Sequence, residues 1–278
     1  KLVDNAWKNG DPGIIFIDEI NRHNPIPEQP IKATNPCGEQ PLSDNESCNL
    51  GSINLAKYFK KTSEILINEK ELAKDVKTAI RFLDDVIEMN KFPLPEIAEQ
   101  SRKTRKIGLG IMGWADLLTM GKISYNSGTA LRIAKKLMRF IKDYAIEATQ
   151  ELAKERGEFP SFNISAFKDE ELKRRNAALV TIAPTGTISM IADTSSGIEP
   201  NFSLAFTKHV MEGEKLLYTN KVLEDTLKEK GIYSKKLIQR IADNGGSLKG
   251  IEEIPDDIKK VFVISHEISP EYHIKMQA

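Results

Sequence analysis

"NPCGEQPLSDNESCNLGSINL", residues 35–55, contains both cysteines of the 278-residue chain. Cys37 and Cys48 lie eleven positions apart, and Asn35 and Glu39 bracket the first cysteine at alternate positions. The segment is too rich in Gly, Pro, Ser and Asn to form a helix. In an extended loop, residues 35, 37 and 39 would point to one side. An amide, a thiol and a carboxylate could then face one small molecule, although a loop with a buried Cys37 and a solvated Glu39 fits the spacing equally well.

Composition places the chain among ordinary globular proteins, with 40% hydrophobic and 29% charged residues. Forty basic residues balance forty acidic ones and no Lys/Arg tract is interleaved with aromatics, so we expect no binding to a nucleic-acid polymer. No apolar run has membrane-spanning length and the first residues are not a signal peptide, which predicts a cytoplasmic protein without membrane contact.

The cysteine and histidine pattern bears on metal and redox chemistry. Two cysteines in an intracellular chain are expected to be free thiols or redox partners. The chain has no C-x-x-C pair and its four histidines are scattered, so we expect no metal site. The missing C-x-x-C also argues against a thioredoxin-like protein, and the lack of a histidine near a helix-borne cysteine argues against a thiol protease.

Strands and long helices are predicted to alternate, which indicates an α/β fold. Strands are expected at 13–20, at 48–59 (where 50–58 could instead begin a helix), at the start of 177–189, at 198–210 and early in 259–277. Helices are expected from Asn68, capped with Glu71, at about 127–156, twice between 212 and 243, and after Ser269 and Pro270. The first residues read as the tail of a helix.

Two glycine-containing motifs could bind phosphate. "GLGIMG", residues 108–113, matches G-x-G-x-x-G, but "EQSRKTRK" before it cannot form the strand that a dinucleotide-binding turn requires. We therefore interpret it as small residues that let a helix pack closely. "APTGTIS", residues 183–189, ends an apolar strand, and the hydroxyls of Thr185, Thr187 and Ser189 could converge with backbone N–H groups on an anion. It lacks the lysine of a Walker motif, and an ordinary strand-to-helix turn is the alternative.

Four motifs together identify a family resemblance. In this order and over nearly the whole chain, the sequence resembles the catalytic subunit of ribonucleotide reductase through "NPCGEQPL…ESCNLGSINL", "RKIGLGIMGWADLL", "APTGTIS…GIEPNFS" and "ISPEYHIKMQA". The close spacing of Cys37 and Cys48 and the sequence of the phosphate turn most resemble those of the adenosylcobalamin-dependent class. The large subunit of a metal-radical-dependent reductase is the alternative, although many of those carry a longer insertion between the two cysteines.

The resemblance implies a portion of a ten-stranded α/β barrel, with a finger loop at about 21–47 and a second half-barrel at about 48–278. It implies that Cys37 becomes the thiyl radical, that Glu39 is the base and that Asn35 holds the ribose hydroxyls. Cys48 would supply reducing equivalents as half of a disulfide. The phosphates of a ribonucleoside di- or triphosphate would be held by Thr185, Gly186, Thr187, Ile188 and Ser189.

The chain also departs from the family pattern. The disulfide partner of Cys48 normally lies in an N-terminal half-barrel, and this chain has no third cysteine. Adenosylcobalamin, an external dithiol and a thioredoxin-like reductant are expected for the complete enzyme. We therefore expect the chain to be a central to C-terminal segment that is inactive without the missing N-terminal segment, or a fragment that only binds nucleotide.

Overall fold

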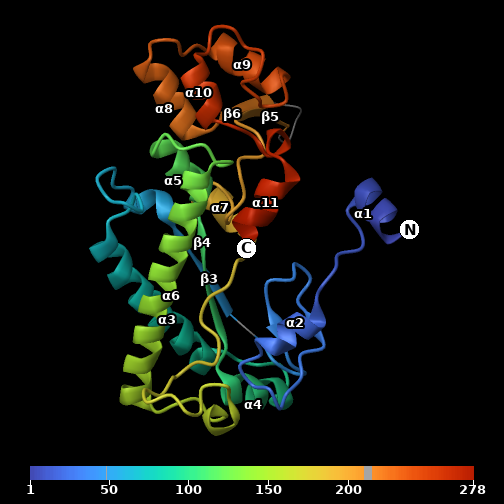
Figure 1. Ribbon diagram of the computed structural model, residues 1–278, viewed down its shortest axis with the longest axis vertical. Helices are drawn as coiled ribbons and strands as arrows, with labels where there is room; N and C mark the ends of the chain where they lie inside the picture. The colour runs from blue at the N-terminus through green and yellow to red at the C-terminus, as the bar shows by residue number, and fades with distance from the viewer. Residues whose placement is uncertain (48, 210–214) are drawn as a thin grey trace. The chain divides into compact units, whose positions relative to one another are not determined.

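The computed structural model describes residues 1–47, 49–209 and 215–278 (Figure 1). The chain divides into two compact units, and it passes between them several times. Unit 1 comprises Lys1–Leu50, Ala79–Leu109 and Ala145–Thr181. Unit 2 comprises Gly51–Thr78, Gly110–Tyr144 and Ile182–Ala278.

Short elements make up much of each unit. Unit 1 contains α1 (Leu2–Asn9), α2 (Ile17–Arg22), β1 (Ala33–Thr34), β2 (Pro41–Leu42), α4 (Pro95–Thr104) and the 3-10 turn η2 (Phe162–Ile164). Unit 2 contains η1 (Leu55–Tyr58), α5 (Trp114–Met120), α7 (Gly186–Ile191), β5 (Ala205–His209), β6 (Lys215–Thr219), α8 (Lys221–Glu229), α9 (Lys235–Asp243), α10 (Asp256–Val261), η4 (Ser265–Glu267) and α11 (Pro270–Gln277). Residues of both units belong to β3 (Asn49–Asn54), α3 (Glu69–Met89), β4 (Ile107–Met112) and α6 (Gly128–Arg156).

The strands form three two-stranded sheets within the described residues. β1 and β2 pair antiparallel, with Ala33 opposite Leu42, and β5 pairs antiparallel with β6. β3 and β4 are neighbours in the remaining sheet. A parallel bridge joins Leu109 of β4 to Val180, so the segment that precedes α7 runs along β4. A strand was predicted at the start of 177–189. The structure has this single bridge at Val180 in its place.

The two long helices confirm their predictions from apolar spacing. In α3 the buried stripe is made of Leu72, Val76, Ile80, Leu83 and Ile87, all at most 5% exposed. Asn68 Nδ2 donates to Glu71 Oε2 at 3.0 Å before the first turn of α3. α6 ends at Arg156, followed by Gly157 with a φ of 83°, a conformation that suits glycine.

Each unit has its own apolar core. In unit 1, a small cluster comprises Ile26, Phe159, Phe162 and Ala177. In unit 2, the larger cluster is contributed by α8, α9, α10 and the segments around them, with Leu204, Leu223, Leu227, Ile238, Ile241 and Leu248 each at most 1% exposed. α8 and α9 begin at side-chain caps, where Asn220 accepts from Leu223 N–H and Ser234 accepts from Leu237 N–H.

Two predicted strands are wrong. Residues 13–16 have no regular structure, and α2 begins at Ile17 with two acidic residues in its first turn. The exposed side chains of Ile14, Ile15 and Phe16 show that no strand of the described chain covers this run. The strand expected early in 259–277 is instead α10 and η4, because a short apolar run has the same pattern in a buried strand and in a helix that packs on a core.

The prediction that residues 108–113 let a helix pack closely is wrong as well. They form most of β4, whose residues are all buried, and Gly113 caps α5. The small residues do allow close packing, since a Cβ on Gly108 would lie 2.4 Å from Leu50 Cδ2. α4 and β6 were not predicted.

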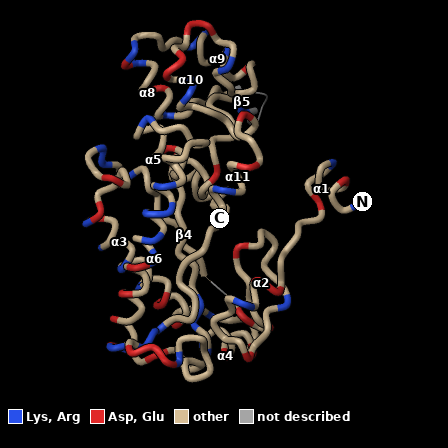
Figure 2. Tube along the Cα trace, in the orientation of Figure 1, with Lys and Arg blue, Asp and Glu red and all other residues tan. Residues whose placement is uncertain are grey.

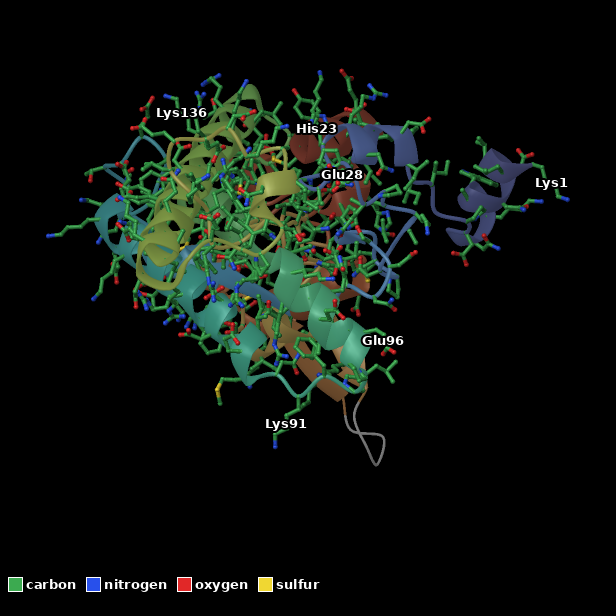
Figure 3. All side chains as sticks on the ribbon, turned by 90° about the horizontal axis from the view of Figure 1, so that it is seen from below. Lys1, His23, Glu28, Lys91, Glu96 and Lys136 are labelled. Atoms are coloured by element: carbon green, nitrogen blue, oxygen red, sulfur yellow. The ribbon has the colours of Figure 1, made fainter. Side chains whose placement is uncertain are left out.

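Basic and acidic residues are interspersed along the described chain (Figure 2). Lys91, Glu96 and Lys136 are exposed and point away from the ribbon (Figure 3). None of the helices in the part of the chain that the structure describes is long and apolar enough to cross a membrane.

Candidate active site

The predicted thiol lies at the tip of a hairpin. β1 and β2 flank the loop of residues 35–40, which is closed by reciprocal contacts between Asn35 and Gln40. Asn35 N–H donates to Gln40 O at 3.2 Å, and Gln40 N–H donates to Asn35 Oδ1 at 2.9 Å. Cys37 is a free, exposed cysteine within this loop. The loop therefore presents the thiol outward from a closed frame.

This geometry corrects the argument from alternating side chains. Residues 36–39 form a turn, Gly38 has a φ of 83°, and Gly38 N–H donates to Asn35 O at 3.0 Å. The backbone is not extended because Asn35 captures two N–H groups of its own loop, one with its carbonyl and one with its side chain. Asn35, Cys37 and Glu39 come together because they share one tight turn.

Glu39 is half-buried, and its Oε2 atom is buried without a hydrogen-bond partner among the described residues. Its backbone carbonyl accepts a hydrogen bond from Thr181 Oγ1 at 2.7 Å. A buried carboxylate oxygen without a donor is unfavourable, so it is the kind of atom that a ligand hydroxyl would satisfy.

Cys48 lies outside the described residues, but the residues before it have buried partners that sequence analysis missed. Glu46 Oε2 pairs with Lys106 Nζ at 2.7 Å, with both side chains at most 2% exposed. Thr104 Oγ1 donates to Glu46 Oε1 at 2.6 Å. Ser47 Oγ lies 2.9 Å from Ser101 Oγ on α4. The segment that follows β2 is thereby tied to α4 and to the start of β4.

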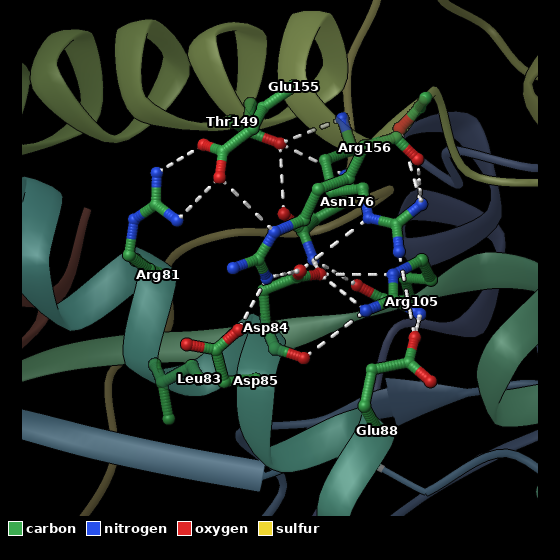
Figure 4. Close-up of polar contacts among 12 residues, drawn as sticks. Arg81, Leu83, Asp84, Asp85, Glu88, Arg105, Thr149, Glu155, Arg156 and Asn176 are labelled. Carbon is green, nitrogen blue, oxygen red and sulfur yellow. Dashed lines mark hydrogen bonds and ion pairs between the residues drawn. The ribbon is translucent and has the colours of Figure 1, made fainter.

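A second buried polar network surrounds Asp84 of α3 (Figure 4). Asp84 Oδ1 accepts from Arg105 Nη2 at 2.7 Å, from Arg105 Nε at 3.0 Å and from Asn176 Nδ2 at 2.9 Å. Arg105 also pairs with Glu88, and Arg156 Nη1 lies 3.3 Å from Asp84 Oδ2. The network joins α3, the end of α4, α6 and the segment before the Val180 bridge inside unit 1. No spacing in the sequence pairs these residues, which come from four separate segments.

The predicted phosphate turn lies in unit 2, where α7 begins at Gly186. Thr185 has a φ of 56°, and its Oγ1 accepts from Gly197 N–H at 2.7 Å. Ser189 Oγ lies 2.8 Å from Ser196 Oγ. Thr185 and Ser189 are buried whereas Thr187 is exposed, so Thr187 carries the accessible hydroxyl of the three, and anion binding at this turn stays a prediction. The turn offers the Thr187 hydroxyl and the N–H groups of the first turn of α7, which have no partner within a helix.

A cavity of about 1190 Å³ lies beside this turn within unit 2. Its lining includes Ser189, Asp193, Thr194, Asp116 and Tyr218. Asp116 Oδ2 accepts from Ser195 N–H at 2.7 Å and from Thr194 Oγ1 at 2.8 Å, which holds the wall in place. Burial, followed by the nearby charge of Asp193, raises the pKa of Tyr218 to about 12, so its hydroxyl stays protonated at neutral pH.

The structure thus gathers the predicted residues into two groups. Asn35, Cys37 and Glu39 share the hairpin loop of unit 1, and residues 185–189 share the turn of unit 2.

Comparison with known proteins identifies the family. The family described as "Ribonucleotide reductase, barrel domain" matches residues 1–174 and 173–278. The chain belongs to this family. The vitamin B12-dependent ribonucleoside-diphosphate reductase of Thermoplasma acidophilum is 51% identical over 278 residues, which are 100% of this chain and 36% of that protein. The protein of the same name from Mycobacterium tuberculosis (strain CDC 1551 / Oshkosh) is 46% identical over 98% of this chain and 39% of its own length.

A solved structure supports the same assignment. The Actinobacillus ureae class Id ribonucleotide reductase alpha subunit superposes with a TM-score of 0.80 at 28% identity, over 99% of this chain and 51% of that chain. The prediction of a portion of the ribonucleotide reductase α/β barrel is therefore confirmed. The chain spans 36% and 39% of the two curated relatives named above. Its division into a finger loop at 21–47 and a half-barrel at 48–278 stays a prediction.

Proposed function

We propose that the chain is the catalytic segment of a vitamin B12-dependent ribonucleoside-diphosphate reductase and that it works as part of a longer enzyme. The observation that carries the proposal is the hairpin loop, where an exposed thiol lies two residues from a carboxylate with a buried, unpartnered oxygen. The family and the names of the relatives reported above point to the reduction of a ribonucleotide. In that reaction two electrons and two protons convert the 2′ hydroxyl to water and leave hydrogen on the 2′ carbon.

The hairpin would begin the reaction. The Cys37 thiyl radical removes the hydrogen atom from the ribose 3′ carbon, which forms the Cys37 S–H bond and leaves a carbon radical. Glu39 accepts the proton of the 3′ hydroxyl, which lies within reach only if the ribose sits against the loop. Because Asn35 Oδ1 is engaged by Gln40 N–H, the Nδ2 amide of Asn35 is the group free to donate to a ribose oxygen.

Reduction would follow at a cysteine pair. The 2′ hydroxyl gains one proton and leaves as water, and a hydrogen takes its place on the 2′ carbon. Two thiols supply these two protons and two electrons as they form a disulfide, and Glu39 returns its proton to the 3′ oxygen. Cys48 would be one of those thiols. The second lies outside this chain, whose only cysteines are Cys37 and Cys48, and the family resemblance implies an N-terminal segment for it. Cys37 then returns the hydrogen atom to the 3′ carbon. An external dithiol, such as a thioredoxin-like reductant, would reduce the disulfide by thiol exchange.

The substrate phosphates would bind at the turn of residues 185–189. Backbone N–H groups of Gly186, Thr187 and Ile188 and the exposed Thr187 hydroxyl are the donors, while Thr185 and Ser189 hold the turn in shape. A nucleoside diphosphate is the substrate class that the names of the relatives support.

The cofactor adenosylcobalamin supplies the initial radical when bound. The chain fits this chemistry at Cys37, because an exposed sulfur at a hairpin tip can exchange a hydrogen atom with a group outside the loop. A metal-radical partner subunit is the rival source of the radical, because the sequence resemblance also extends to the large subunits of metal-radical-dependent reductases.

One experiment tests the function and separates these sources. The complete reductase that contains this segment is assayed for deoxynucleotide formation with and without adenosylcobalamin, in the wild type and in Cys37→Ser. Activity that requires both the cofactor and Cys37 supports the proposal. Activity without cobalamin would assign the chain to the metal-radical class, and full activity of Cys37→Ser would overturn the thiyl mechanism.

A further inference from the structure

The contact between Thr181 and Glu39 joins residues that are 142 positions apart in the sequence and both belong to unit 1. Thr181 Oγ1 donates to the backbone carbonyl of Glu39 at 2.7 Å. Thr181 is 9% exposed, so the hydrogen bond is shielded from water on the threonine side. No motif in the sequence links the two residues.

Thr181 is itself held by β4. Its N–H donates to Leu109 O at 3.1 Å, and Leu109 N–H donates to Leu179 O at 2.8 Å. The parallel bridge between Leu109 and Val180 lies between these two contacts. The hydroxyl that reaches Glu39 is therefore carried by backbone anchored on both sides to a buried strand.

Gly108 of β4 leaves the space in which this contact forms. A Cβ there would lie 2.6 Å from Gln40 Nε2 and 2.9 Å from Thr181 Cγ2. Such distances require the neighbours to shift, and one of these neighbours is part of the hairpin loop. Glycine is needed here for space, since its φ is not in the positive region.

The hairpin loop connects the Thr181 contact to the Glu39 carboxylate. Gln40 is 7% exposed and is bonded in both directions to Asn35, so these bonds tie the two ends of the loop together. Glu39 Oε2 has no donor among the described residues that could orient the carboxylate directly. Its position is set instead through the backbone of residue 39, which Thr181 holds.

We propose that Thr181 is a positioning residue for Glu39 and that Gly108 keeps open the place where the two meet. The proposal rests on the proposed function of Glu39 as the base. Thr181 touches neither substrate nor reacting atoms; it acts by keeping the Glu39 carboxylate where the 3′ hydroxyl arrives. Misplacement of such a group by about 1 Å can lower a rate about 100-fold.

The test uses the complete reductase with three substitutions. Thr181→Val keeps the shape of the side chain and removes the hydroxyl that donates to Glu39 O, whereas Thr181→Ser keeps this hydroxyl. Thr149→Val is a matched control. Thr149 is fully buried in the same unit, and its Oγ1 donates to Asn176 Oδ1 at 3.0 Å and accepts from Arg175 N–H at 3.0 Å, away from the hairpin. The measurements are kcat, KM, release of tritium from 3′-tritiated substrate, and melting temperature.

We expect Thr181→Val to lower kcat and the rate of tritium release at least tenfold with KM within about twofold of wild type, following the sensitivity to misplacement above. Thr181→Ser should recover most of the rate, and Thr149→Val should lower the melting temperature without a specific loss of kcat. Wild-type kcat in Thr181→Val, or equal kcat losses in Thr181→Val and Thr149→Val at equal stability, would overturn the positioning role.

The same measurements test the proposed reductase function separately from the role of Thr181. If Cys37→Ser abolishes tritium release while Thr181→Val leaves it unchanged, the positioning role alone is wrong. If Cys37→Ser releases tritium as the wild type does, the proposed function itself fails.

Discussion

Lys106 Nζ and Glu46 Oε2 form an ion pair 2.7 Å long in which neither side chain is more than 2% exposed. Glu46 also accepts from Thr104 Oγ1 at 2.6 Å and from Ser43 N–H at 2.6 Å, so three donors stabilise its buried charge. Removing one partner of such a pair leaves a buried charge uncompensated, which is far more costly than losing the pair as a whole.

Lys106→Met should therefore lower the free energy of unfolding by about 3 to 5 kcal/mol. Glu46→Gln in the Lys106→Met background should recover part of that loss, because the amide keeps an acceptor oxygen for Thr104 and removes the buried charge. Urea denaturation of the complete reductase measures both. Lys103→Met is the control, since Lys103 is half-exposed and pairs with Glu99, which is 67% exposed, and should cost well under 1 kcal/mol. Equal losses of unfolding free energy in Lys106→Met and Lys103→Met would show that burial does not make the Lys106–Glu46 pair more important for stability.

Sequence patterns predicted the elements that pack through one periodic face. α3 and α6 follow the 3.6-residue spacing of their apolar positions. α3 begins at Glu69, next to the predicted cap Asn68, and α6 comes within one residue of the predicted 127–156 at both ends. The short apolar runs at 13–20 and 259–268 have no such period, and their form depends on what they pack against. Burial of β4, which decides the role of Gly108, was likewise hidden, because Gly108 contacts residues 40, 50 and 181 from distant parts of the chain.

The candidate site was predictable in composition and not in geometry. Asn35, Cys37 and Glu39 were found from their types and spacing, yet the turn that groups them depends on the side-chain acceptor of Asn35 and on the conformation of Gly38. The hydroxyls of Thr185 and Ser189 were expected to face a ligand. They are engaged by Gly197 and Ser196, which the sequence does not indicate.

The bond from Gly197 N–H to Thr185 Oγ1 makes a prediction about stability. Thr185→Ala removes the acceptor and leaves a buried N–H unsatisfied, which should cost about 1 to 3 kcal/mol. Thr185→Ser keeps the oxygen and should cost much less, although both variants retain the positive φ. Thermal unfolding of the two variants isolates the hydroxyl. Equal melting temperatures for Ala and Ser would show that the hydrogen bond does not stabilise the turn.

Gly186 tests the phosphate site. A Cβ at Gly186 would meet no atom within 4 Å, and its φ is not positive, so Gly186→Val should fold with nearly wild-type stability. The side chain would nevertheless block close approach of a phosphate to the first turn of α7, so the KM for substrate should rise at least tenfold. Steady-state kinetics and a melting curve on the same preparation measure both effects. An unchanged KM would return the segment to an ordinary turn.

Completeness of the chain gives a further prediction. The proposed reaction needs one thiol for the radical and two for reduction, and the chain has two cysteines in all. The isolated 278-residue chain should therefore form no deoxynucleotide, with or without cobalamin and dithiol, whereas adding the N-terminal segment in trans or by fusion should restore activity. Product is measured by chromatography of the nucleotides. Multiple turnovers by the isolated chain would refute the requirement for a third thiol.

Substitution of the two cysteines should block the reaction at different steps. Cys37 is needed to remove the 3′ hydrogen, because no other side chain of the hairpin loop can carry a radical of suitable energy. Cys48 is needed only when the 2′ hydroxyl leaves and two electrons must be supplied. In the complete enzyme, Cys37→Ser should abolish tritium release from 3′-tritiated substrate, while Cys48→Ser should still release tritium yet form little deoxynucleotide.

The exposure of Cys37 makes this comparison clean. A serine at the tip of the hairpin loop replaces a free, exposed thiol, so Cys37→Ser should leave the melting temperature within about 1 °C of wild type, as surface substitutions have small effects on stability. Loss of tritium release in a stable variant then reports chemistry rather than folding. If the two serine variants released tritium equally, separate roles for the cysteines could not stand. A matched fall in activity and melting temperature in both would indicate two packing thiols instead.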